Sequence, residues 1–268
     1  MEQNKQYKLI AFDIDGTILS HEHKVCPELK IVVDKLHKMG YMFTLVSARL
    51  PDSALYIAKD LGLTKDEYII PLNGAFITNY KHDIIYNKSF NTDSFDVHLD
   101  AISPNIAVNY YYQFAWHVLR PNEVTKHEQI MIGDTNYTYY TDKINIANKI
   151  TLMGEYEDLL HAKNTLAKLN PSLLIAFSHP KYLEIAHKDI SKYSGLTAYA
   201  NKLNINTSQI IAFGDGENDI DMLSHVGLGV AMDNASPHVK TFAKDIAPHH
   251  LESGVAKYLT KLINNNIL

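Results

Sequence analysis

The sequence predicts an α/β fold, in which helices cover both faces of a parallel sheet and an α+β domain is inserted into the first domain. Three observations predict it: short apolar runs that end at polar turns, segments of helical spacing between those runs, and a change of texture in the middle of the chain. Residues 9–12, Leu-Ile-Ala-Phe, form the first apolar run. Such a run is typical of a strand buried on both faces of a parallel sheet.

Strand and helix signals alternate along the first 80 or so residues. Residues 27–40 have apolar side chains at helical spacing, with proline at the beginning and glycine at the end. Residues 41–46 form a second apolar run, residues 51–61 a second helix, and residues 68–72 a third apolar run. A strand, a helix and a strand of these lengths predict a βαβ unit with a right-handed crossover. We therefore expect these strands to lie parallel in one sheet.

From about residue 83 the chain becomes rich in aromatic residues and strand-like segments. The aromatic residues of 109–116 are interpreted mainly as core and strand face rather than as a pocket lining. We expect strands at 149–153, 173–178 and 182–185, and an amphipathic helix at 155–169. The α/β pattern returns near residue 191. The predicted domains are a core made of residues 1–82 and 187–268, and an inserted domain at 83–186.

Composition excludes several classes of protein. The 268 residues are 46% hydrophobic and 21% charged, an ordinary balance for a globular chain. The net charge is −5 and no basic run occurs, which argues against a nucleic-acid partner. Cys26 is the only cysteine, which excludes an internal disulfide and a cysteine-based zinc site. No apolar run approaches the ~20 residues of a membrane span. We expect a cytoplasmic protein with no membrane partner, and the oligomeric state is unknown.

Acidic side chains directly follow two of the apolar runs. Asp13 and Asp15 come after the first, and Asp215 and Asp219 come after the run at 209–213. On an extended backbone, residues two apart point to the same side. Two carboxylates held that close repel each other unless a cation or a proton lies between them. Because ligands of open α/β sheets bind at the carboxyl ends of the strands, these residues predict a site at that edge.

Each of these features also has a plainer interpretation. Asp13 to Gly16 could form only a turn after a strand. A calcium loop fits poorly, because the EF-hand has its glycine at the sixth position and here it is at the fourth. A single Ser47 after a strand is more often a helix cap, and a single Lys192 at the start of a helix is usually a surface charge. The functional interpretation therefore rests on the combination and order of these residues.

Four groups of residues occur in an order that resembles the haloacid dehalogenase (HAD) superfamily of phosphohydrolases: Asp13 with Asp15, Ser47, Lys192, and Asp215 with Asp219. Within that superfamily the chain is similar to the Cof-type sugar-phosphatase branch. This similarity extends to three further stretches: Asn73-Gly74-Ala75, residues 178–185 and residues 229–235.

The spacing of these groups indicates where the inserted domain belongs. Only about 29 residues separate Thr17 from Ser47, too few for an extra domain, whereas about 140 separate Arg49 from Lys192. The resemblance therefore implies a Rossmann-like core with a C2-type cap inserted at the second position.

By this resemblance, the chain would hydrolyse phosphate monoesters with Mg²⁺ as its cofactor. Asp13 would be the nucleophile that forms an aspartyl-phosphate, Asp15 the general acid and base, and Lys192 the cation that offsets the charge of Asp13 and the phosphate. Mg²⁺ prefers oxygen ligands. It would be held by Asp13, the backbone carbonyl of Asp15, and Asp215, with Asp219 acting as support or through water.

The resemblance also implies which residues contact the substrate. The groups that would bind the phosphoryl oxygens are the Ser47 hydroxyl, the amides of Ile14 and Ala48, Lys192 and Asn218. Pocket residues would be Arg49, Asn73 and Gly74. Ala48 and Tyr193 stand where the family often has glycine, which questions the loop geometry but removes no catalytic group.

The leading hypothesis is a phosphatase that acts on a small phosphorylated metabolite such as a sugar phosphate, with the cap selecting the substrate. The first alternative is a phosphomutase similar to phosphomannomutase, which would return the phosphoryl group to the sugar. The second is a non-catalytic protein that binds a phosphorylated metabolite. Such a protein would most simply have lost Asp13, Asp15 or Lys192, and all three are present.

Overall fold

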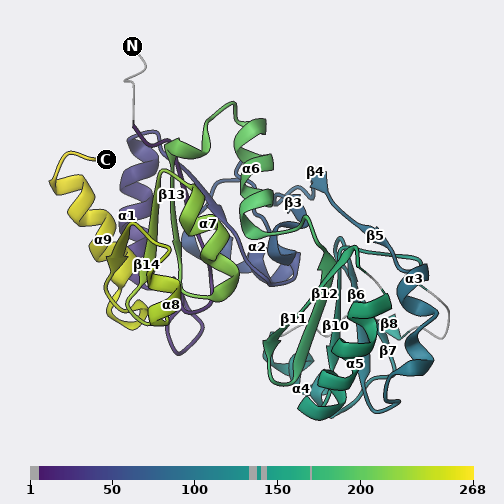
Figure 1. Cartoon of the computed structure of the whole chain (residues 1–268). Coiled ribbons are helices and arrows are strands. Elements are labelled where there is room, and N and C mark those ends of the chain that lie inside the picture. Colours follow the sequence, from purple (N-terminus) through teal and green to yellow (C-terminus); the bar gives the residue numbers. More distant parts are fainter. Residues whose placement is uncertain (1–5, 133–137, 140–143, 170) are drawn as a thin grey trace. The chain divides into compact units, whose positions relative to one another are not determined.

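The computed structural model describes residues 6–132, 138–139, 144–169 and 171–268. The chain divides into two compact units (Figure 1). The first unit combines Met1–Tyr86 with Ser191–Leu268, and the second is Asn87–Ile190. These boundaries lie about four residues after the predicted ones. The role of the second unit as a cap stays a prediction.

The first unit is built on a five-stranded sheet in the order β15-β14-β13-β1-β2. Its strands are β1 (Leu9–Phe12), β2 (Met42–Leu45), β13 (Ile210–Gly214), β14 (Leu228–Met232) and β15 (Asp245–Ala247). Every neighbouring pair is parallel. All four residues of β1 are fully buried, as expected of a strand in the middle of a covered sheet. Parallel pairing places the carboxyl ends of all five strands at one edge.

Helices cover both faces of this sheet. They are α1 (Pro27–Lys38), α2 (Pro51–Leu61), α6 (Lys192–Lys202), α7 (Ile220–His225), α8 (Pro237–Lys240) and α9 (Gly254–Asn264). Alternate side chains of a strand point to opposite faces. Ala11 of β1 packs in one core cluster with Leu196 of α6. On the other face, the ring of Phe12 lies 5.6 Å from that of Phe213, which lies 5.6 Å from the Tyr258 ring of α9. The predicted fold class is confirmed.

The predicted third strand at 68–72 is wrong as a regular strand. Ile70 makes a single parallel bridge with Val46, and Ile69 a single antiparallel bridge with Thr78. Pro71 has no N–H to donate to a ladder, and Leu72 follows it with a φ of 54°, so the chain turns away. The turn leads into β3 (Phe76–Thr78), which pairs with β4 (Ile84–Asn87).

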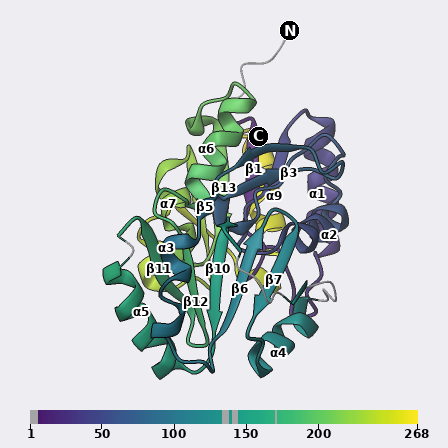
Figure 2. The ribbon, with the colours of Figure 1, turned by 90° about the vertical axis from the view of Figure 1, so that its right-hand side faces the viewer.

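The second unit contains a six-stranded sheet in the order β11-β12-β10-β6-β7-β8. Its strands are β6 (Ala107–Tyr112), β7 (Ala115–Leu119), β8 (Thr138–Tyr139), β10 (Lys149–Met153), β11 (Leu173–His179) and β12 (Tyr182–His187). All neighbours are antiparallel except β7 and β8. Figure 2 shows β11, β12, β10, β6 and β7 side by side. The predicted strands at 149–153, 173–178 and 182–185 are confirmed.

One face of this second sheet packs against α5 (Tyr156–Leu169), in a cluster that includes Ile150, Leu152 and Leu159. The described part of this unit also contains the helices α3 (Asp93–Asp96) and α4 (Glu123–Ile132) and a short pair of strands, β5 (Phe90–Asn91) with β9 (Ile146–Ala147). Tyr110 and Trp116 are buried, as the interpretation of the aromatic segment as core requires. Within the described residues, no helix is long and apolar enough to span a membrane.

Candidate active site

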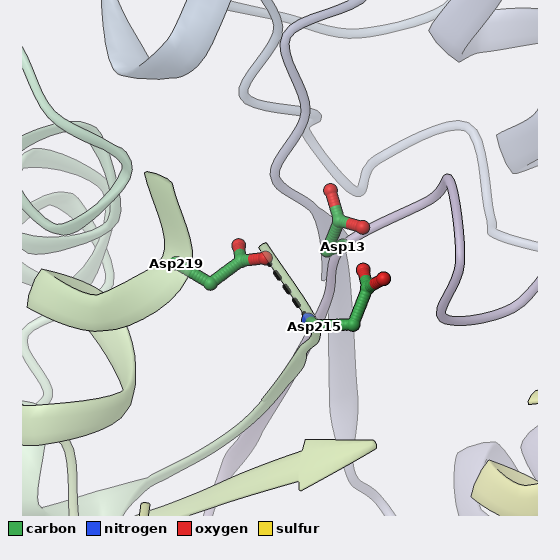
Figure 3. Close-up of side chains that lie close together, drawn as sticks. All are labelled: Asp13, Asp215 and Asp219. Carbon is green, nitrogen blue, oxygen red and sulfur yellow. Dashed lines mark hydrogen bonds between the residues drawn. The ribbon is translucent and has the colours of Figure 1, made fainter. Parts of the chain in front are cut away.

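The carboxyl ends of β1 and β13 bring three aspartates together (Figure 3). Asp13 follows β1 and Asp215 follows β13, and the Asp13 amide donates to the Phe213 carbonyl at 2.9 Å. Asp13, Asp215 and Asp219 each offer an oxygen, and these atoms all lie within 4.8 Å of one another. The parallel register of two neighbouring strands therefore produces the predicted acidic site.

Lys192 connects two of these aspartates. Its Nζ donates to Asp13 Oδ1 at 2.6 Å and to Asp219 Oδ1 at 2.7 Å, and the side chain is buried. Burial favours the neutral amine, but Asp13 and Asp219 outweigh it and hold the pKa of Lys192 above its usual value. Lys192 is therefore a buried ammonium at the site. The predicted surface-charge alternative for this lysine is wrong.

The start of α6 fixes the position of Lys192. The preceding residue, Ser191, caps the helix: its Oγ accepts from the Ser194 amide at 3.0 Å, and Ser194 Oγ accepts from the Ser191 amide at 2.9 Å. The Ser191 hydroxyl also donates to Asp221 Oδ2 of α7 at 2.7 Å. These bonds attach the lysine-bearing helix to the segment that follows Asp219.

Burial raises the pKa of the Asp13 carboxyl to about 8, although Lys192 opposes the shift. Asp13 Oδ1 is bound by Lys192, and Oδ2 accepts from the Thr17 hydroxyl at 3.2 Å. Burial, together with the charge of Asp219, also raises the pKa of Asp215 to about 6. Both carboxyl groups therefore ionise less readily than an exposed aspartate, chiefly because they are buried.

The donor set fits a divalent cation that prefers oxygen ligands. When the four aspartates at positions 13, 15, 215 and 219 are all ionised, their negative charge exceeds the positive charge of their partners Lys192 and Arg49. Both carboxylate oxygens of Asp219 already accept hydrogen bonds from the protein. Its Oδ1 accepts from Lys192, and its Oδ2 accepts from the amides of Asp215 (3.1 Å) and Gly216 (3.0 Å). This arrangement suits support of the loop better than direct ligation.

Asp15 lies differently from the sequence expectation. The chain turns immediately after Asp13, because the Ile14 carbonyl accepts from the amides of Thr17 and Ile18. The extended backbone assumed for Asp13 and Asp15 is therefore wrong. The carboxylate of Asp15 forms a two-point ion pair with Arg49, with Nε to Oδ2 at 2.8 Å and Nη2 to Oδ1 at 2.6 Å.

Ser47 and Asn73 lie side by side where the chain leaves β2. The Ser47 hydroxyl accepts from the Arg49 amide at 3.1 Å, so its proton remains available to an acceptor. The Ser47 carbonyl accepts from the Asn73 amide at 2.8 Å. Asn73 Oδ1 in turn accepts from Asn218 Nδ2 at 3.0 Å. Ser47, Asn73 and Asn218, all predicted to contact the substrate, are thus neighbours in space.

A model of the family described as haloacid dehalogenase-like hydrolase matches residues 10–259. The chain belongs to this family. A putative phosphatase of Haemophilus influenzae is 31% identical over 256 residues, which are 94% of this chain and 97% of that protein. The 5-amino-6-(5-phospho-D-ribitylamino)uracil phosphatase of Bacillus subtilis is 28% identical over 253 residues, which are 93% of each chain.

The HMP-PP phosphatase of Serratia proteamaculans is 27% identical over 267 residues, covering 94% of each chain. Among solved structures, a haloacid dehalogenase-like hydrolase from Bacteroides thetaiotaomicron superposes with a TM-score of 0.86 at 22% identity, over 96% of this chain and 99% of that one. The predicted family and the predicted enzyme class, a phosphatase of the HAD superfamily, are confirmed.

The structure of this hydrolase also shows structural roles of two residues that the sequence did not predict. Gly74 has a φ of 98°, and a Cβ added to it would lie 2.0 Å from the Ser191 carbonyl oxygen. A Cβ on Gly195 would likewise lie 2.6 Å from Gly74 Cα. Gly74 was predicted as a pocket residue, and here it lets the loop approach the start of α6. Asn234, to which no role was given, donates to Asp215. Its place two residues after an apolar run was the available signal.

Proposed function

We propose that this hydrolase is a Mg²⁺-dependent phosphatase that cleaves the monoester of a small phosphorylated metabolite through an aspartyl-phosphate. The observation that carries the proposal is the buried Lys192 ammonium held by Asp13 and Asp219 beside Asp215. One cation that holds one oxygen of a buried carboxylate leaves the other oxygen for nucleophilic attack. Lys192 occupies Asp13 Oδ1, so Oδ2 is the proposed nucleophile.

In the first step, Asp13 Oδ2 forms a bond to phosphorus while the bond from phosphorus to the leaving oxygen breaks. Asp15, protonated and released from its ion pair with Arg49, gives its proton to that oxygen and is left as a carboxylate. Phosphate monoesters are among the slowest biological bonds to hydrolyse without a catalyst, and a carboxylate nucleophile divides the reaction into two easier steps. The Thr17 hydroxyl, 3.2 Å from Oδ2, is placed to keep this oxygen oriented.

In the second step, water attacks the phosphorus of the aspartyl-phosphate, Asp15 accepts the water's proton, and inorganic phosphate and the free Asp13 carboxylate are formed. Asp15 must leave its ion pair with Arg49 to reach the reacting oxygen, because both of its carboxylate oxygens contact the guanidinium. Its side chain is 54% exposed, which leaves it room to rotate.

Mg²⁺ would supply the positive charge that lets a carboxylate approach a phosphate dianion. Asp13, Asp215 and the backbone carbonyl of Asp15 are its proposed ligands, with Asp219 in support. The groups proposed to bind the phosphoryl oxygens are the Ser47 hydroxyl, the amides of Ile14 and Ala48, Lys192 and Asn218. Ala48 is not among the described residues with positive φ, so alanine causes no backbone strain there.

The second unit, residues 87–190, is the proposed cap that selects the substrate, together with Arg49, Asn73 and Gly74 in the core. Two relatives that align with more than nine tenths of the chain are named for phosphatase activity on small phosphorylated compounds. The net charge of −5 also favours a small metabolite over nucleic acid. The proposed location is the cytoplasm, with no membrane partner.

The test is release of inorganic phosphate from an aryl phosphate and from a panel of phosphorylated metabolites, in Mg²⁺ and in EDTA. We expect release only with Mg²⁺, and no release by Asp13→Asn, whose circular dichroism should match that of the wild type. Near-normal turnover by Asp13→Asn would refute the nucleophile assignment. Transfer of the phosphoryl group to another position of the sugar, with no free phosphate, would identify a mutase instead.

A further inference from the structure

Asn234 connects four neighbouring strand ends. It lies two residues after β14, and its Nδ2 donates to the Gly16 carbonyl at 2.8 Å and to Asp215 Oδ2 at 3.0 Å. Its Oδ1 accepts from the His250 amide at 3.2 Å, in the segment that follows β15. Gly16 follows β1 and Asp215 follows β13. One side chain thus joins the loops after β1, β13, β14 and β15.

The partners of Asn234 determine how its amide is oriented. A backbone carbonyl only accepts a hydrogen bond and a backbone N–H only donates one. The Gly16 carbonyl therefore requires the NH₂ group on its side, and the His250 amide requires the oxygen on the other side. With both ends fixed, the second hydrogen of Nδ2 is directed at Asp215 Oδ2. The contact with Asp215 follows from the backbone and does not depend on the charge of Asp215.

The two oxygens of Asp215 are consequently unequal. Oδ2 accepts from Asn234 and also faces Gly16, where an added Cβ would lie only 2.2 Å from it. Among the residues that the structure describes, the hydrogen-bond donor to Oδ1 is the Thr17 hydroxyl alone, at the longer distance of 3.4 Å. That hydroxyl has one proton and also lies 3.2 Å from Asp13 Oδ2, so it can donate to only one of the two carboxylates at a time. Of the two oxygens of Asp215, Oδ1 is therefore the more weakly hydrogen-bonded.

We propose that Asn234 is a positioning residue that limits Asp215 to one metal-facing oxygen, Oδ1, and thereby makes the site favour Mg²⁺ over the larger Ca²⁺. Mg²⁺ requires nearly ideal octahedral geometry, whereas Ca²⁺ takes six to eight oxygens and accepts both oxygens of one carboxylate. A carboxylate held to one free oxygen suits the smaller ion. The inference rests on the proposed role of Asp215 as a Mg²⁺ ligand.

Asn79 offers a matched control. It lies between β3 and β4, and its Nδ2 donates to the Asp83 carboxylate at 3.2 Å. Its Oδ1 accepts from the amides of Lys81 (2.9 Å) and Asp83 (3.1 Å). Asn79 therefore makes the same kinds of bonds as Asn234, an amide to a carboxylate and backbone amides to its oxygen, but not to Asp215.

The experiment is titration of the full metal-free chain with MgCl₂ and, separately, with CaCl₂ in a calorimeter, without substrate. The proteins are the wild type, Asn234→Ala, and Asn79→Ala. Loss of a residue that orients a metal ligand typically weakens binding about 10–100-fold. We expect Asn234→Ala to weaken Mg²⁺ binding by at least about 10-fold and Ca²⁺ binding by much less, so that the preference for Mg²⁺ falls by about 10-fold. Asn79→Ala should leave both affinities unchanged.

Equal weakening of both ions, or an unchanged preference, would overturn the inference while leaving the proposed metal function standing. A wild-type protein that binds neither ion would refute both the inference about Asn234 and the proposed Mg²⁺ site. Asn234→Ser, whose shorter side chain cannot reach Asp215 and Gly16 together, provides the same comparison if the alanine variant does not fold. Circular dichroism of each variant shows whether its fold is retained.

Discussion

Replacing Asp215 by asparagine should stabilise the metal-free protein at pH 8. Burial raises the pKa of this carboxyl from 3.8 to about 6, so its charged form is less favourable in the folded chain than in the unfolded one. That difference corresponds to about 3 kcal/mol of lost stability when Asp215 is ionised in both states. Because the side chain is only half-buried, solvent screening lowers the figure to about 1–2 kcal/mol.

Asparagine removes the charge without removing the hydrogen bonds. Its oxygen can still accept from Asn234 Nδ2, and its NH₂ group can donate to the Thr17 hydroxyl oxygen. The gain should depend on pH. Because the pKa of Asp215 is raised in the folded state, its contribution to the stability of the wild type is fully present below about pH 4 and is lost as pH rises through about 6. At pH 5 the advantage of Asp215→Asn should therefore be about half of its value at pH 8.

The assay is urea unfolding followed by circular dichroism, in EDTA at pH 8 and pH 5. The variants should share one m value, so that a difference in midpoint reports a difference in stability. Asp66→Asn is the control, because Asp66 is 86% exposed in its surface ion pair with Lys81 and should change little. Saturating Mg²⁺ should make the wild type more stable than Asp215→Asn, because the ion should bind and stabilise only the wild type. A metal-free Asp215→Asn that is less stable at pH 8, or an advantage that does not shrink at pH 5, would refute this reasoning.

Two other substitutions test how Lys192 is held. Lys192→Met leaves two buried carboxylates without their cation, and loss of one partner of a buried ion pair typically costs about 3–5 kcal/mol. Urea unfolding in EDTA should show this cost, and adding Asp13→Asn should recover part of it; a cost below about 1 kcal/mol would contradict the buried-charge account. Gly74→Ala should lower kcat, because the new Cβ would lie 2.0 Å from the carbonyl oxygen of the residue before Lys192. Gly62→Ala is its control, because Gly62 has a similar φ of 90° but no atom within 4 Å of the added Cβ. Both variants should lose about 1 kcal/mol or more of stability from the backbone strain of alanine at positive φ. Only Gly74→Ala should also lose turnover. Equal kcat values for the two would show that Gly74 does not position Lys192.

Local pattern was sufficient for most of the fold. The apolar run at 9–12 is a fully buried strand, and proline opens α1 and α2 as the sequence predicts. Burial imposes these patterns one element at a time, so they can be read without knowing the partner of each element. The segment at 68–72 shows the limit of this approach. Its composition favours a strand, but Pro71 cannot donate to a ladder and the chain turns.

The order of these polar groups along the chain also predicted which residues would meet. Asp13 and Asp215 come together because their parallel strands present their carboxyl ends at one edge of the sheet, and Asp219 lies beside them in the segment after β13. Lys192, 179 residues from Asp13, is not at a strand end: it is the first residue of α6, and its Nζ lies 2.6 Å from Asp13 Oδ1. Only the resemblance to the HAD superfamily predicted its place at the site.

By itself, then, the sequence determined the type of each layer, the edge of the sheet that carries the site, and the acidic and basic groups that gather there. Only the tertiary structure decided how each side chain is oriented: that Arg49 binds Asp15, that Gly74 admits the start of α6, and that Asn234 reaches Gly16 from 218 residues away. The physical reason is one of range. Periodicity and turn chemistry act between near neighbours in the chain, whereas the partner of a hydrogen bond is set by packing between segments that are distant in sequence.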